Sequence, residues 1–336
     1  MSAGRTIAVG DIHGCSMELS RLIEVLSLTA NDTVVFLGDY IDRGPDSKGV
    51  IDLIVDLRDK CNVVTLKGNH EAMFIDFLES PESAGAGLFV LNGGSATLAS
   101  YAGERGSFVL PESHIKFLYD LKLTFETDTH FFVHAGVPLK PLNELDEQAE
   151  ETTLLWSRQP FLSTTQKWEK VIVHGHTPVN DVEVKPNRIN VDTGCVYDNH
   201  LSAIELPSGR IYRIPRRAGL KPVLFPIEAD SPRVAVRFSG RLPVRASKPG
   251  KSQIDFETLN YNQFGLLMEQ KGTSFSVPFA VGDRIEGVIG EDGQTAIEFQ
   301  GEVVRIETRS ERRLFGVRID RVKNGDDGRV WIERPS

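Results

Sequence analysis

Short apolar runs alternate with helical patterns through the first half of the chain. The runs Thr6–Val9, Thr33–Leu37 and Val63–Leu66 have the length and β-branched content of buried strands. Apolar residues recur at helical spacing in the segments between and after them, Ser16–Leu28, Ser47–Leu57 and Glu71–Leu78. Strands alternating with helices favour right-handed βαβ units and a largely parallel sheet.

The pattern continues to residue 214 and then changes. We predict strands at His130–Val133, Val171–Val173 and Ile189–Val191, and a hairpin of Leu201–Leu206 with Arg210–Ile214. Residues 215–232 carry four prolines and little periodicity, which indicates a linker. From residue 233 onward, short alternating runs broken by glycine, aspartate and proline predict a small antiparallel barrel. The predicted domains are therefore 1–214 and 233–336, joined by 215–232.

Length, charge and cysteine content exclude several classes of protein. A chain of 336 residues is long enough for two domains. Its net charge of −9 argues against a general nucleic-acid binder, because such proteins neutralise phosphates with basic residues. No segment is apolar over a membrane-spanning length, and the three cysteines are widely spaced and odd in number. We therefore expect a cytoplasmic protein with neither a nucleic-acid nor a membrane partner.

Five polar clusters follow predicted strands. Each combines aspartate, asparagine or histidine with glycine: 10-GDIHG-14, 38-GDYIDRG-44, 68-GNHE-71, 134-HAG-136 and 174-HGHT-177. Sites in α/β proteins form at the carboxyl ends of strands, where these clusters would meet. Oxygen and imidazole donors suit divalent Mn, Fe or Zn, and the lack of thiolates argues against a structural zinc cage. The clusters predict a divalent-metal site.

The order and wording of these clusters resemble the catalytic domain of the PPP-type metallophosphatases over residues 5–214. The resemblance implies an α/β sandwich of two facing mixed sheets with flanking helices. It also implies two metal ions. One would be held by Asp11, His13 and Asp39, and the other by Asp39, Asn69, His134 and His176. Because the family motif is GHT, the ligand is assigned to His176, and His174 is expected either to support a metal ligand or to have a structural role.

The same resemblance implies roles around the metals. His70 would donate a proton to the leaving oxygen, and Asp42 would orient it; Arg43 and Arg158 would grip the phosphate, since a guanidinium meets phosphate in a bidentate fashion. A hydroxide bridging the two ions, Mn²⁺ by preference with Fe or Zn as alternatives, would attack phosphorus.

The sequence is compatible with two classes of phosphate substrate. The retained 42-DRGPDS-47 favours phosphomonoester hydrolysis, with phosphoserine and phosphothreonine proteins as substrates and phosphotyrosine proteins as a further option. The alternative within the same chemistry is a dinucleoside polyphosphate hydrolase. The alternative of another class is a catalytically silent binding scaffold, which the intact set of candidate residues disfavours.

The barrel segment, from 233-RVAVRFSGRLPVR-245 through 260-NYNQFG-265 to 299-FQGEVVRIETRSERRLFGVRI-319, resembles a PilZ domain. That resemblance implies cyclic di-GMP binding, with candidates Arg233, Arg237, Asn260, Asn262 and Gly265, and regulation of the phosphatase by the nucleotide. Arginines at every fourth position leave three registers open, and Asn262 stands where serine is expected. A barrel that docks a partner protein, or that packs on the phosphatase, remains an alternative.

Overall fold

A computed structural model describes residues 4–81, 89–102, 108–216, 242–262, 265–270, 278–289, 297–309, 312–324 and 332–333. The chain divides into two compact units, one formed by Met1–Ile75 with Gly94–Pro226 and the other by Asp76–Gly93 with Ile227–Ser336. The domain boundaries expected from the sequence stay a prediction. Within the described residues, no helix is both long and apolar enough to cross a bilayer.

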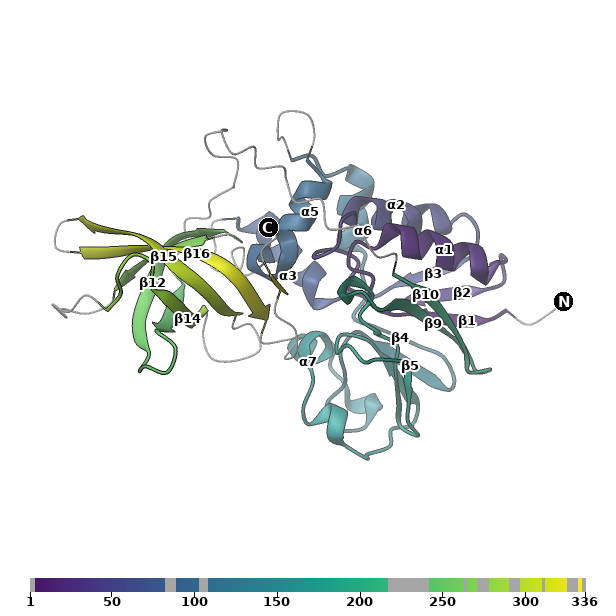
Figure 1. Ribbon diagram of the computed structural model, residues 1–336. Coiled ribbons are helices and arrows are strands. Elements are labelled where there is room, and N and C mark those ends of the chain that lie inside the picture. The colour runs from purple at the N-terminus through teal and green to yellow at the C-terminus, as the bar shows by residue number, and fades with distance from the viewer. Residues whose placement is uncertain are drawn as a thin grey trace. The chain divides into compact units, whose positions relative to one another are not determined.

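The first unit contains a five-stranded mixed sheet in the order β10-β9-β1-β2-β3. Its parallel centre is β1 (Thr6–Val9), β2 (Thr33–Phe36) and β3 (Asn62–Thr65), and its antiparallel edge is β9 (His200–Leu206) and β10 (Arg210–Pro215). The connecting helices are α1 (Ser16–Leu26) and α2 (Ser47–Leu57), and α3 (Asn69–Glu79) follows β3. Helices α1 and α2 cover one face of this sheet (Figure 1).

A second five-stranded sheet, in the order β4-β5-β6-β8-β7, packs on the other face. Strands β5 (His130–Val133), β6 (Val171–His174) and β8 (Arg188–Asn190) are parallel, with β4 (Thr124–Glu126) and β7 (Glu183–Val184) antiparallel at the edges. One apolar cluster joins both sheets, and it includes Val35 and Ile204 from the first and Phe132 and Val173 from the second. The predicted arrangement of two facing mixed sheets is therefore confirmed.

Short helices fill the connections of the first unit. They are α5 (Ser95–Ser100), α6 (Glu112–Tyr119), α7 (Glu151–Trp156), and single turns at Leu142–Glu144, Phe161–Ser163 and Cys195–Tyr197. Of these, α5, α7 and the turn at Cys195–Tyr197 carry residues that reach the site described below.

The second unit contains an antiparallel barrel, as predicted. Its strands are β11 (Pro243–Ser247), β12 (Ile254–Asn262), β13 (Gly265–Gln270), β14 (Arg284–Ile289), β15 (Ile297–Arg309) and β16 (Arg312–Asn324), with β17 (Ile332–Glu333) beside β16. Pairing of β13 with β16 closes the barrel. Its interior contains a cluster of three aromatic rings whose centroids lie 5.5 to 5.7 Å apart, those of Phe256, Phe279 and Phe315.

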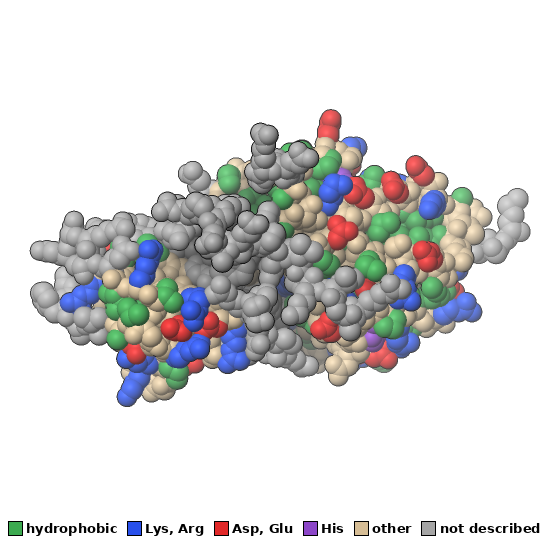
Figure 2. All heavy atoms as spheres, turned by 45° about the horizontal axis from the view of Figure 1, so that its top comes forward, with side chains coloured by type: hydrophobic (Ala, Val, Ile, Leu, Met, Phe, Trp, Pro, Cys, Tyr) green, Lys and Arg blue, Asp and Glu red, His purple; other side chains and the backbone are tan. Residues whose placement is uncertain are grey.

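Basic and acidic side chains are interspersed on the barrel surface in the view of Figure 2. Arg318 contacts Glu302 at 2.6 Å and Asp320 at 3.4 Å, and Arg284 pairs with the same aspartate. These two arginines therefore form surface ion pairs with carboxylates.

Candidate active site

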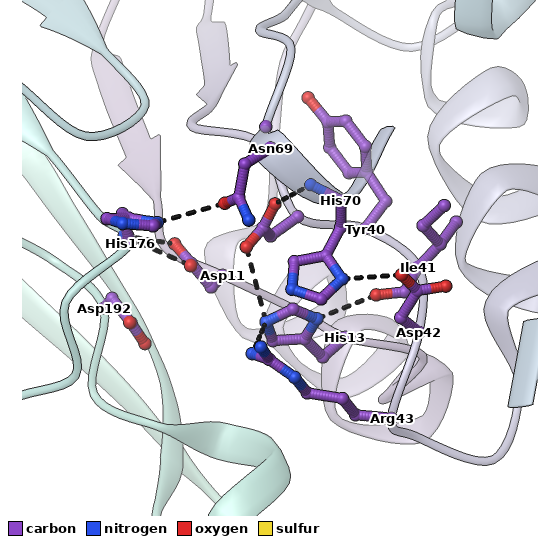
Figure 3. Close-up of polar contacts among 12 residues, drawn as sticks. Asp11, His13, Tyr40, Ile41, Asp42, Arg43, Asn69, His70, His176 and Asp192 are labelled. Atoms are coloured by element: carbon purple, nitrogen blue, oxygen red, sulfur yellow. Dashed lines mark hydrogen bonds and ion pairs between the residues drawn. The ribbon is translucent and has the colours of Figure 1, made fainter. Parts of the chain in front are cut away.

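The five polar clusters lie at the carboxyl ends of β1, β2, β3, β5 and β6. Figure 3 shows side chains from these strand ends close together, among them Asp11, Asn69 and His176. The six candidate metal ligands are all buried: Asp11, His13, Asp39, Asn69, His134 and His176. Polar side chains buried at such density need compensation, because an unpaired charge in the interior is costly.

His13, Asp39 and His70 form one group whose candidate ligand atoms lie within 4.8 Å of one another. His13 Nε2 lies 3.5 Å from Asp39 Oδ2, while His13 Nδ1 donates to the Ile41 carbonyl at 2.7 Å. Since Nδ1 holds the proton, Nε2 presents its lone pair to the site, where the Arg43 guanidinium donates to it at 2.8 Å.

Asp39, His134 and His176 form a second group of the same kind. His134 Nε2 lies 3.5 Å from Asp39 Oδ1, and Asn69 Oδ1 lies 2.9 Å from His134 Nε2 and 3.0 Å from His176 Nδ1. Asp39 therefore turns one carboxylate oxygen toward each group, which is the arrangement that a bridging ligand requires.

Asp11 lies beside His176, whose backbone N–H donates to its carboxylate at 3.1 to 3.2 Å. Among the described residues, Asp11 is in neither group of converging ligand atoms. Burial, followed by the negative charges of Asp192 and Asp39, raises the pKa of Asp11 well above its usual value. A cation beside these carboxylates would offset that repulsion.

The donor atoms fit a pair of divalent cations. His134 Nδ1 donates to the Leu37 carbonyl, and burial lowers the pKa of this histidine to about 4, so its Nε2 carries a lone pair at neutral pH. That lone pair faces the carbonyl oxygen of Asn69, and two acceptors so close are stabilised by a cation between them. Glycine at position 68 keeps the space clear, because a Cβ there would lie 2.1 Å from Asp39 Oδ1.

His70 and Asp42 form a buried pair, with 2.5 Å between Nδ1 and Oδ2. Burial lowers the pKa of His70 and raises that of Asp42. The tautomer follows: Nδ1 is committed to Asp42, and Nε2 is the nitrogen left to act on another molecule.

The two candidate phosphate-binding arginines lie at the same site. Arg43 stacks on the ring of Tyr197, 5.8 Å from its centroid. Arg158 follows α7 and is half-buried. The pKa of His176 is lowered mainly by burial and then by His134, and the positive charge of Arg158 lowers it further. The structure therefore brings all four candidate catalytic residues to the candidate metal ligands.

The backbone of the site is strained. Seven described non-glycine residues have positive φ, and five of them belong to the candidate set: His13, Asp39, Asp42, Arg43 and His176. Side chains rarely adopt this conformation, and such residues cluster where function requires them.

Three further side chains hold this site together and were not predicted. The carboxylate of Glu71 accepts backbone N–H groups from Asp39, Tyr40 and Gly68 at 2.8 to 3.0 Å. Thr97 and Ser47 contact Asp42 through their hydroxyl groups. Glu71 stands inside 68-GNHE-71 and could have been found there, whereas Thr97 carries no signal in the sequence.

His174 lies apart from both groups of ligand atoms. Its ring packs edge-on against Phe161 with 5.1 Å between centroids, and its Nε2 has no hydrogen-bond partner in the described part of the chain. The supporting or structural role expected for His174 stays a prediction.

The candidate nucleotide-binding residues of the barrel are only partly covered. Arg233 and Arg237 lie outside the described residues. Asn260 and Asn262 end β12, and Gly265 begins β13 opposite Asn262 in the hairpin register. The placement of these three is known for the backbone alone.

Comparison with known proteins finds two family models that match this chain, together with relatives of known description. A model described as Calcineurin-like phosphoesterase matches residues 4–204, and one described as PilZ domain matches residues 230–333. The asymmetrical bis(5'-nucleosyl)-tetraphosphatase PrpE of Oceanobacillus iheyensis is 30% identical over 236 residues, covering 62% of this chain and 91% of that protein.

Two further similarities are to proteins named for different substrates. Serine/threonine-protein phosphatase 1 of Salmonella typhimurium is 30% identical over 205 residues, covering 58% of this chain and 88% of that protein. A crystal structure provisionally described as a diadenosine tetraphosphatase shares 26% identity with a TM-score of 0.51, covering 65% of this chain and 96% of that chain.

Proposed function

Because this chain belongs to the calcineurin-like phosphoesterase family and ends in a PilZ domain, we propose that its first unit hydrolyses dinucleoside polyphosphates. Members of this family are metal-dependent phosphoesterases with a binuclear metal centre. Two of the three relatives described above are named for diadenosine or bis-nucleosyl tetraphosphates. They support this substrate more than the phosphoprotein reading expected from 42-DRGPDS-47.

The observation that carries the chemistry is the placement of Asp39 between two groups of imidazole and amide donors. His13 and Asp39, with Asp11 nearby, would hold one cation. The second would be held by Asp39, Asn69, His134 and His176. When bound, two divalent cations, in our proposal Mn²⁺, supply Lewis acidity to phosphate oxygens and lower the pKa of water.

The chain's own residues bind the substrate and move a proton. Arg43 and Arg158 would grip the phosphate oxygens, since a guanidinium donates two parallel hydrogen bonds to such an anion. His70, held through Nδ1 by Asp42, would donate from Nε2 to the oxygen that leaves phosphorus. Water adds to phosphorus and one P–O bond breaks, so asymmetrical cleavage of diadenosine tetraphosphate gives ATP and AMP.

The test compares two substrates with one preparation. Metal-stripped protein is reconstituted with Mn²⁺, and turnover of diadenosine tetraphosphate and of a phosphothreonine peptide is measured, with His70→Asn as the control for contaminating phosphatases. We expect faster release of ATP and AMP than of inorganic phosphate from the peptide. A large preference for the peptide would overturn this substrate, and inactivity with every divalent metal and phosphoester would indicate a silent scaffold.

Phosphoprotein hydrolysis is the second candidate, and the His70–Asp42 pair favours it. A serine or threonine alkoxide is a poor leaving group, so its departure depends on a well-placed proton donor more than the departure of a nucleotide does. The Salmonella relative is named for this activity.

We further propose that the PilZ domain binds cyclic di-GMP and that binding changes phosphoesterase turnover. PilZ membership supports this, and Arg233, Arg237, Asn260, Asn262 and Gly265 are the candidate contacts. Calorimetric titration of the whole protein tests it. Absence of a heat of binding at high micromolar cyclic di-GMP would overturn the proposal. Binding without a change in turnover would show that the nucleotide does not regulate the phosphoesterase.

A further inference from the structure

Thr97 contacts Asp42 twice although it lies 55 residues away in the sequence, in α5. Its Oγ1 accepts the backbone N–H of Asp42 at 2.8 Å and donates to Asp42 Oδ1 at 2.5 Å. Thr97 and Asp42 are both fully buried, and His70 is 1% exposed. The Thr97 hydroxyl therefore contacts both the backbone and the carboxylate of Asp42, which in turn holds the candidate proton donor His70.

The hydrogen-bond directions in this cluster are determined. A hydroxyl has one proton and two lone pairs, and the proton of Thr97 is given to Asp42. Ser47 Oγ must then donate in its 3.0 Å contact with Thr97, and it also accepts the Asp42 N–H at 3.1 Å. The result is a directed chain from Ser47 to Thr97 to Asp42 Oδ1, with His70 Nδ1 on the other carboxylate oxygen.

We propose that Thr97 is a positioning residue for proton donation by His70, acting through Asp42. This inference rests on the proposed function. Asp42 has a φ of 72°, which a side chain disfavours, and Thr97 grips it at the N–H and at Oδ1 in that conformation. Because the backbone N–H and Oδ1 of Asp42 are both held, its Oδ2 points at His70 Nδ1 and sets the orientation and tautomer of the His70 ring. Loss of the hydroxyl leaves a buried carboxylate oxygen without that partner and lets the carboxylate turn.

The inference predicts a dependence on the leaving group. An alkyl phosphate ester releases a strongly basic alkoxide, so its hydrolysis suffers most when the proton donor is misplaced. The nitrophenolate of p-nitrophenyl phosphate leaves without a proton. A merely structural role for Thr97 would lower both reactions together.

The experiment measures kcat and KM of Thr97→Val and Thr97→Ser with a phosphothreonine peptide and with p-nitrophenyl phosphate. For Thr97→Val we expect kcat on the peptide to fall about 10- to 100-fold, as for other residues that orient an active group through a partner. On the aryl ester we expect a fall of less than about threefold, with Mn²⁺ affinity unchanged. Thr97→Ser, which keeps the hydroxyl, should restore most of the peptide activity.

Two controls make the outcome decisive. Thr258→Val removes a buried hydroxyl from the barrel and should leave both reactions unchanged. In an Asp42→Asn background, Thr97→Val should add nothing, because Thr97 acts only through Asp42. Equal losses on both esters, or additive losses in the double variant, would overturn the inference while the proposed function stands. A wild-type protein that hydrolyses neither ester nor diadenosine tetraphosphate would overturn both. Thr97→Ala replaces Thr97→Val if the latter does not fold.

Discussion

Arg5 and Asp32 form a well-satisfied ion pair at the start of β1 and β2. The Asp32 side chain is 4% exposed, and its carboxylate contacts Arg5 Nη2 at 2.7 Å and the Thr29 N–H at 2.9 Å. The hydrogen bond from Arg5 holds the pKa of Asp32 well below its usual range. A depressed pKa in the folded state means that the carboxylate stabilises the fold above its unfolded pKa of about 3.9.

We therefore expect Asp32→Asn to lower the free energy of unfolding by about 2 kcal/mol at pH 7, the size of a hydrogen bond to a charged group. The difference from wild type should shrink below about pH 4, because the Asp32 carboxylate of the unfolded chain then takes up a proton while that of the folded protein does not. Urea unfolding at pH 7 and pH 3 measures both values. A difference that stays constant across this range would contradict the pairing.

Residues of the site differ in how far the sequence could predict them. Asp39 and His134 belong to short motifs in which residue type, glycine neighbours and a preceding strand all agree, and the structure places them together. Thr97 stands in 91-LNGGSATLAS-100, an ordinary helical stretch, and acquires its contact only when α5 packs near α2. A hydroxyl whose partner lies 55 residues away leaves no periodicity or spacing to detect.

At the scale of elements, the first turn of α3 holds the loop after β2. Glu71 Oε2 accepts the N–H of Asp39 at 2.9 Å and of Gly68 at 3.0 Å, and Oε1 accepts that of Tyr40 at 2.8 Å. In Glu71→Gln, the amide NH₂ would face N–H donors. We expect Mn²⁺ affinity to fall about 10- to 100-fold, because the loop that presents Asp39 loses its support. Calorimetry with Mn²⁺ measures this, and unchanged affinity would show that the loop holds its shape without Glu71.

Buried strands and helices with two or more apolar turns were predictable, and shorter helices were not. The bounds of β1, β5 and α2 agree with the prediction from the sequence. The helix expected to reach Leu28 ends at Leu26, because Ser27 takes a left-handed conformation. Helix α6 was missed, since eight residues carry too little periodicity; a tertiary contact supports it, from His114 Nε2 to Asp52 at 2.9 Å.

For the whole molecule, two compact units predict two thermal transitions in calorimetry. Mn²⁺ should raise the transition of the first unit, by about 2.7 kcal/mol of stability for each site when free metal is 100 times its Kd, and chelation should reverse the shift. The barrel transition should respond to cyclic di-GMP instead. A single transition raised by both ligands would show that the units unfold as one.

The left-handed backbone at five site residues has a consequence for protein engineering. A non-glycine residue in this conformation costs roughly 1–2 kcal/mol, and Asp39 and Arg43 lie at φ of 53° and 65°. Glycine at either position would relieve that strain and abolish the side chain that the site needs. Directed evolution that selects for heat resistance alone would therefore favour glycine at these positions and yield stable but inactive proteins. Any such campaign on this chain has to select for turnover in the same round.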